Sequence, residues 1–187
     1  MTNAATPAQG EPKTTAVRDG HTIDTSRLEA WLVEHATGVT PPIELRQFAA
    51  GQSNPTYLIK AANGQFVMRK KPPGDLLPSA HMIEREHRIM EALGPTDVPV
   101  PAMRVFCDDP EVIGTPFFIM DHVAGRVFQD PALPGMIPTE RRATFRDIAH
   151  TLARLHSVDW MSAGLGDFGK HSGYAERQVR LWTRQYE

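Results

Sequence analysis

Residues 66–93 read FVMRKKPPGDLLPSAHMIEREHRIMEAL, and this stretch decides the fold. It begins with the pattern of a strand, breaks at the prolines 72 and 73, and continues with the period of an amphipathic helix. Glu86 falls within about 100° of the apolar positions of that helix, so it points to the buried face. An unpaired carboxylate is costly to bury, so Glu86 needs a cation from a neighbouring element.

Arg69 is the cation that we expect to fill this role. Side chains alternate along a strand, so Val67 and Arg69 share one face while Phe66 and Met68 share the other. Arg69 stands near the end of its strand and can reach a helix packed on the sheet. The alternative is that the helix rolls slightly and leaves Glu86 in water. A buried ion pair between Arg69 and Glu86 is therefore a prediction.

The surrounding sequence indicates an α+β fold with a mostly antiparallel sheet of about five strands. Segments 43–50, 56–61 and 65–70 are strand-like, and Asn63-Gly64 joins the last two as a hairpin. Two further strands are expected within 98–109 and 117–123, and helices within 24–37, 139–159 and 174–187. Ser79 is expected to cap the helix that contains Glu86.

Composition excludes several classes of protein. The 187 residues carry 20 Lys and Arg against 22 Asp and Glu, a formal charge of −2 that argues against nucleic-acid and membrane-surface binding. The single cysteine cannot form an internal disulfide, and the histidines lack metal-binding spacing. Residues 1–22 are polar and aperiodic, as in a disordered leader. A cytoplasmic protein without a metal site of its own is expected.

Two further segments have the character of a nucleotide site. The small-residue loop GQSNPT at 51–56 lies between two strands, and Gly51, Ser53 and Asn54 can offer N–H groups and a hydroxyl to phosphate. An ordinary hairpin loop is the alternative. The run FFIMDHV at 117–123 turns polar at Asp121, as in a hinge that pairs with adenine through its backbone; an ordinary edge strand is the alternative.

A resemblance to a known family rests on several stretches of the sequence taken together. They are FAAGQSNPTYLI, FVMRKKPPG, IEREHRIMEAL, GTPFFIMDHVAGRV, and GLGDFG followed by YAERQVRLW. Over about residues 24–187 the chain resembles the N-terminal part of the aminoglycoside phosphotransferase/choline-kinase-like family. The branch most similar to it comprises kinase domains fused to acyl-CoA dehydrogenases. The resemblance implies a protein-kinase-like fold, ATP and Mg²⁺ as cofactors, and a small-molecule hydroxyl acceptor.

The resemblance also assigns roles to residues. Arg69 takes the place of the phosphate-binding lysine of the third strand, and Glu86 that of its helix partner. The implied hinge comprises Met120, Asp121, His122 and Val123, and the implied nucleotide site also includes Val67. A nucleotide-binding lobe would span 23–120, with the hinge and the start of a helical lobe at 121–187.

The sequence also departs from the family pattern. The His-Gly-Asp type catalytic loop with its following asparagine, and the later metal-binding aspartate, are missing from the sequence. We therefore expect no catalytic residue here, a catalytic aspartate beyond Glu187, and an inactive chain that ends inside a helix as in a truncated reading frame. Asp167-Phe168-Gly169 is expected to be a helix-terminating loop that binds nothing.

Two alternatives stay open at this point. One is a non-catalytic nucleotide- or partner-binding module derived from the same fold, and the other is a fragment without a function of its own. The final helix places Val179, Trp182 and Tyr186 on one apolar stripe, which favours self-association.

Overall fold

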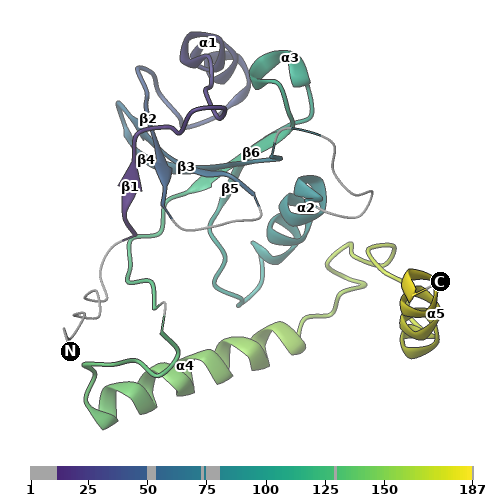
Figure 1. Cartoon of the computed structure of the whole chain (residues 1–187). Coiled ribbons are helices and arrows are strands. Elements are labelled where there is room, and N and C mark those ends of the chain that lie inside the picture. Colours follow the sequence, from purple (N-terminus) through teal and green to yellow (C-terminus); the bar gives the residue numbers. More distant parts are fainter. Residues whose placement is uncertain (1–11, 50–53, 73, 75–80, 129, 187) are drawn as a thin grey trace.

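A six-stranded antiparallel sheet organises the chain, with helices on both of its faces (Figure 1). The computed structural model describes residues 12–49, 54–72, 74, 81–128 and 130–186. The strand order is β1-β2-β3-β4-β6-β5. The strands are β1 Thr14–Thr15, β2 Glu44–Phe48, β3 Thr56–Ala61, β4 Gly64–Lys70, β5 Met103–Cys107 and β6 Phe117–Asp121. The predicted α+β class is confirmed, with one strand more than expected.

One face of the sheet packs on α1 (Thr25–His35) and the short α3 (Pro110–Ile113). Asp24 caps α1, since its carboxylate accepts a hydrogen bond from the backbone N–H of Arg27 at 3.1 Å. The main apolar core lies between these helices and the sheet. Its fully buried members include Leu28, Leu32, Tyr57, Ile59, Met68, Phe117 and Ile119.

The opposite face packs on α2 (Ile83–Leu93), the helix that carries Glu86. Ile83 and Leu93 are buried there, and the ring of His87 lies against the rings of Phe106 and Phe118. The helix begins at Ile83, later than a cap at Ser79 would place it, and Met82 precedes the helix and is exposed. The expected cap Ser79 lies outside the described residues.

The N-terminal segment differs from the disordered leader expected for residues 1–22. Thr14 and Thr15 pair with β2 as an edge strand, and the N–H of Arg18 donates to Oε1 of Gln47 at 3.0 Å. A strand of two polar residues satisfies hydrogen bonds at the sheet edge without any apolar periodicity, so the sequence pattern did not reveal it. Residues 1–11 lie outside the described part of the chain.

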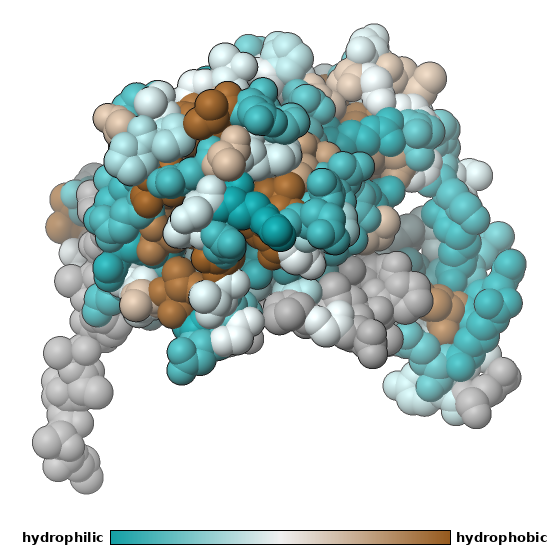
Figure 2. Space-filling model, turned by 90° about the horizontal axis from the view of Figure 1, so that it is seen from above, coloured by the Kyte–Doolittle hydropathy of each residue, from teal (hydrophilic) through white to brown (hydrophobic). Residues whose placement is uncertain are grey.

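Two long helices follow the sheet, α4 (Pro138–His156) and α5 (Tyr174–Tyr186). Neither contains a buried residue. Their apolar side chains are exposed, among them Phe145, Ile148, Leu152, Leu155, Val179 and Trp182. By contrast, the view from above in Figure 2 shows the side of the sheet that bears α1 and α3 as mainly polar, with scattered apolar residues. No described helix combines the length and apolarity needed to cross a membrane.

Candidate nucleotide site

Arg69 and Glu86 form the predicted ion pair. Arg69 lies on β4 between Thr56 of β3 and Phe118 of β6, on the face that packs against α2. Its Nη1 lies 2.5 Å from Oε1 of Glu86. The side chains are 29% and 25% exposed, so both charges are largely withdrawn from water. The prediction that Glu86 points into the lobe toward a strand-borne cation is confirmed.

Asn54 and His81 extend this pair into a network. The amide Nδ2 of Asn54 donates to Oε2 of Glu86 at 3.2 Å, and Nδ1 of His81 lies 3.0 Å from the amide oxygen of Asn54. Asn54 is buried, and His81 adopts a left-handed backbone conformation with φ of 58°. Such a conformation is uncommon outside glycine, and here it lies two residues before the start of α2.

The sequence suggested that the backbone N–H of Asn54 contacts phosphate, and this stays a prediction. The structure adds a role for its side chain, which bonds to Glu86 and fixes the carboxylate that faces Arg69. Gly51 and Ser53, from the same loop, lie outside the described residues. His81 was not selected from the sequence, because a lone histidine before a helix gives no signal of a contact 27 positions away.

Arg69 keeps a buried donor for which the described residues supply no partner. Its Nε is buried, yet it makes no hydrogen bond within the described part of the chain. A buried donor without an acceptor costs about 1–3 kcal/mol. A phosphate oxygen is a suitable acceptor for a guanidinium, so this orphaned donor fits the anionic end of a nucleotide.

An apolar row lies on the same face of the sheet, two residues along from Arg69. Leu58, Val67 and Met120 are direct cross-strand neighbours on β3, β4 and β6. Leu58 and Val67 are buried. Two residues along a strand span roughly 6.6 Å, so the row and Arg69 can contact separate parts of one extended ligand. Val67 was selected from the sequence; Leu58 was missed, although strand alternation places it on this face.

The segment selected as a hinge runs off the end of β6. The N–H of Asp121 donates to the carbonyl of Ala102 at 2.9 Å, and its carboxylate pairs with Arg104 at 2.6 and 2.8 Å. The hydrogen bonds that this carboxylate accepts from Arg104 raise the pKa of the Arg104 guanidinium. The N–H of His122 donates to the carbonyl of Gln65 at 3.4 Å.

Val123 differs from its two predecessors. It is 69% exposed, and its N–H is engaged by no residue in the described ranges. Val123 is thus the residue of this segment whose backbone donor is available to a ligand.

The described residues contain no group of three or more His, Cys, Asp or Glu side chains that could hold a metal ion. Asp167, in the GLGDFG segment, is paired with Arg88 of α2, and the hydrogen bond from Arg88 lowers the pKa of its carboxyl. The residues present therefore do not fit a magnesium site, and no chemical step is derived through one.

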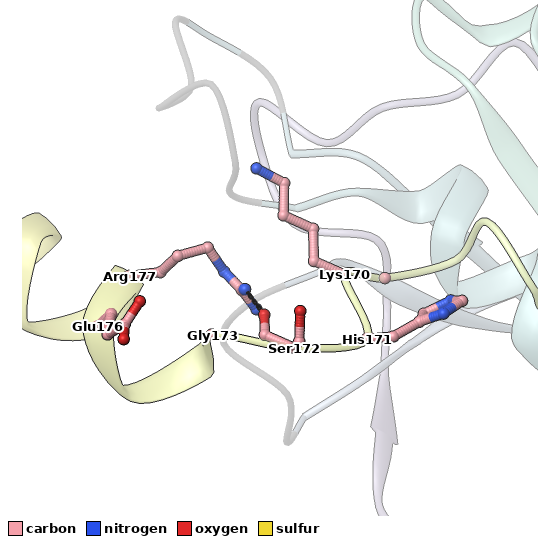
Figure 3. A pocket seen from close by; sticks show the side chains of 7 residues that line it. Lys170, His171, Ser172, Gly173, Glu176 and Arg177 are labelled. Carbon is pink, nitrogen blue, oxygen red and sulfur yellow. Dashed lines mark hydrogen bonds between the residues drawn. The ribbon is translucent and has the colours of Figure 1, made fainter.

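A polar hollow lies between the end of this segment and the start of α5 (Figure 3). It is lined by Gly169–Gly173, Glu176 and Arg177. Figure 3 shows the guanidinium of Arg177 directed at Ser172, whose carbonyl accepts its hydrogen bond. All of the lining comes from one short stretch of chain and includes no member of the Arg69 network.

Comparisons with known proteins place this chain in a family. The chain belongs to the phosphotransferase enzyme family, which it matches over residues 44–187. Its fold is similar to a solved structure from Ralstonia eutropha JMP134 that carries the assignment of aminoglycoside phosphotransferase, with a TM-score of 0.76 and 45% identity. That match covers 88% of this chain and 47% of the other. The protein-kinase-like architecture expected from the resemblance is confirmed.

Similar sequences occur within much longer proteins. The mouse acyl-CoA dehydrogenase family member 10 is 48% identical over 181 residues, which cover 95% of this chain and 17% of that protein. The human acyl-CoA dehydrogenase family member 11 is 42% identical over 184 residues, which cover 96% of this chain and 24% of that protein. The chain therefore spans about a fifth of the length of these relatives, and the resemblance to the branch fused to acyl-CoA dehydrogenases is confirmed.

Proposed function

We propose that this chain is the nucleotide-binding part of an ATP-dependent phosphotransferase that acts on a hydroxyl group of a small molecule. The observation that carries the proposal is the Arg69–Glu86 pair. Its arginine retains a buried donor, beside an apolar row, for which no described residue supplies an acceptor. Membership of the phosphotransferase enzyme family supports it.

Each group in the site has a proposed role in binding ATP. The adenine lies against Leu58, Val67 and Met120, and its edge accepts a hydrogen bond from the N–H of Val123. Asp121 and His122 complete the hinge backbone. The lining side chains are apolar and the polar contacts few, as in typical small-molecule sites.

The phosphates are proposed to meet Arg69. Glu86 orients the guanidinium, and Asn54 in turn orients Glu86, so the charge is held in place before the nucleotide arrives. Gly51 and Ser53 are proposed to add backbone and hydroxyl contacts from the preceding loop. Phosphoryl transfer depends mainly on positioning and on stabilising charge, and this lobe supplies the positioning of the donor.

The remaining catalytic parts are proposed to come from residues that follow Glu187 in a longer protein. They are an aspartate that positions the acceptor hydroxyl and the side chains that hold Mg²⁺, which would neutralise charge on the phosphates. For the acceptor, the relatives named as acyl-CoA dehydrogenases favour a hydroxylated acyl compound over an aminoglycoside. A cytoplasmic location and self-association through α5 stay predictions.

A second candidate is a non-catalytic nucleotide-binding module. Such a module needs the Arg69 network but no catalytic aspartate.

One experiment separates the candidates. ATP binding and ATP turnover are measured in the presence of Mg²⁺ and a panel of hydroxylated acyl compounds. The proteins compared are residues 1–187 and a longer protein of this family that contains them. We expect the chain alone to bind ATP without transfer, and the longer protein to transfer phosphate. Binding without transfer by both would favour the non-catalytic module. Transfer by residues 1–187 alone would refute the placement of the catalytic aspartate, and absence of ATP binding by both would refute both candidates.

A further inference from the structure

Two arginines on the outer side of α2 hold the segment that follows α4. Arg88 donates through both terminal nitrogens to the carboxylate of Asp167, with Nη1 at 3.1 Å from Oδ2, and also to the carbonyl of Gly164 at 2.9 Å. Arg85 donates to the carbonyl of Phe168 at 2.6 Å, and its guanidinium lies 4.0 Å from the centre of the Phe168 ring. One turn of α2 thus makes several charged and stacking contacts with one loop.

The same turn of α2 carries Glu86. Arg85 is its immediate neighbour and Arg88 lies two positions further, yet Glu86 faces β4 while the arginines face the loop. Any rotation of α2 about its axis that moves Glu86 away from Arg69 must also disturb the contacts of Arg85 and Arg88. The loop therefore opposes the rotation that would break the ion pair.

The loop is built to act as a fixed support. Leu165 is buried, and its carbonyl accepts a hydrogen bond from the N–H of Phe168 at 2.9 Å. Gly164 has φ of 73°, and a Cβ on Gly166 would lie 3.1 Å from the sulfur of Met161. The chain thus turns tightly and packs closely at these two glycines, which fixes where Asp167 and Phe168 stand.

We propose that Asp167 and Phe168 are positioning residues for the nucleotide site: they hold α2 through Arg88 and Arg85, and α2 holds Glu86 against Arg69. This inference rests on the proposed nucleotide-binding function of the lobe. The affinity for ATP then depends on a loop that follows α4 and that contributes no group to the network of Arg69, Glu86, Asn54 and His81. The DFG tripeptide then has a structural role in this chain, because its carboxylate is committed to an arginine.

The test measures ATP binding by the chain of residues 1–187 and by its double variant Asp167→Ala/Phe168→Ala. The same two proteins are also measured with Arg69→Ala added to each. We expect the double substitution to weaken ATP binding about 3- to 10-fold when Arg69 is present, and less than about twofold when it is absent. Equal weakening in both backgrounds, or none in either, would overturn the proposal. Asp147→Ala is the matched control, since it removes an exposed carboxylate from α4 and should leave binding unchanged.

Backbone hydrogen exchange of α2 supplies a readout that does not need ATP. We expect the amides of α2 to exchange faster in the double variant and to be unaffected by Asp147→Ala. Should neither the unchanged chain nor the longer protein bind ATP, the proposed function fails, and the exchange rates still decide whether the loop holds α2. Unaltered exchange would overturn the support role.

A charge exchange covers the case in which the double variant does not fold. Arg88→Asp and Asp167→Arg are each expected to accelerate exchange in α2, and their combination is expected to restore protection at least in part. Failure of the combined variant to improve on either single change would overturn the proposal.

Discussion

Oε1 of Glu86 lies 2.5 Å from Nη1 of Arg69, and this contact joins α2 to the face of the sheet that carries the proposed nucleotide site. The second oxygen of the same carboxylate accepts a hydrogen bond from Asn54. Both oxygens of Glu86 therefore bond to groups inside the protein. Glu86 links Arg69 to Asn54, which in turn contacts His81. The first two predictions follow from this position.

Glu86→Gln keeps the size of the side chain and removes its charge. We expect ATP affinity to fall about 3- to 10-fold, because the amide holds the Arg69 guanidinium less firmly, and the free energy of unfolding to fall by about 1–3 kcal/mol. Titration calorimetry and urea unfolding measure the two effects. Glu84→Gln on the same helix is the control, since its pair with Lys71 is more exposed; equal effects of both substitutions would contradict the account.

Asn54→Asp is expected to be more harmful than Asn54→Ala. The alanine variant only removes two hydrogen bonds, whereas aspartate places a second carboxylate next to that of Glu86 and competes for Arg69. Urea unfolding at pH 7 should rank the stabilities as asparagine, then alanine, then aspartate. Gln65→Glu adds the same charge at an exposed position of β4 and should change stability little. An aspartate variant as stable as the alanine variant would show that the network is not formed.

Val123→Pro tests the hinge. Proline removes the one N–H of this segment that no described residue engages, so ATP affinity should fall about 2- to 10-fold, the effect of losing one hydrogen bond. The melting temperature should hardly change, since Val123 is exposed and outside any helix or strand. Val127→Pro, in the same exposed stretch, is the control. An affinity unchanged by Val123→Pro would exclude this N–H as a contact to adenine.

His87 should make the lobe less stable in mild acid. Burial against Phe106 and Phe118 lowers the pKa of His87, although the Glu91 carboxylate partly opposes this shift. The unfolded chain then binds a proton more readily than the folded one, so His87 reduces stability as the pH falls from about 7 through 6.5 toward its lowered folded pKa. Unfolding by urea at several pH values should show this loss, and His87→Gln should reduce it. A pH dependence identical in both proteins would contradict the assignment.

Much of the fold could be predicted because its signals are local. Asn63-Gly64 marks the β3–β4 hairpin, and the period of apolar residues marks the helices. The Arg69–Glu86 pair followed from a single physical requirement, since a carboxylate on a buried helical stripe needs a cation and only one neighbouring strand offered a suitable one.

Other parts of the site left no local signal. The side-chain contact of Asn54 with Glu86 joins residues 32 positions apart, and the contact of Asp167 with Arg88 joins residues 79 positions apart. Neither contact depends on the periodicity of apolar residues or on the residue composition of a turn. Long-range contacts between polar residues of this kind become visible only once the packing of α2 is known.

Titration of ATP into the chain of residues 1–187 and into its Arg69→Ala variant tests the central claim most directly. Arg27→Ala is the matched control, because Arg27 lies on α1 at the opposite face of the sheet and bonds the carbonyl of Glu111. The account predicts that the unchanged chain and the Arg27 variant bind ATP equally, and that the Arg69 variant binds about 10- to 100-fold more weakly, the range for a charged hydrogen bond to phosphate. Equal affinity for all three proteins, or binding by none of them, would contradict the assignment of this face as the nucleotide site.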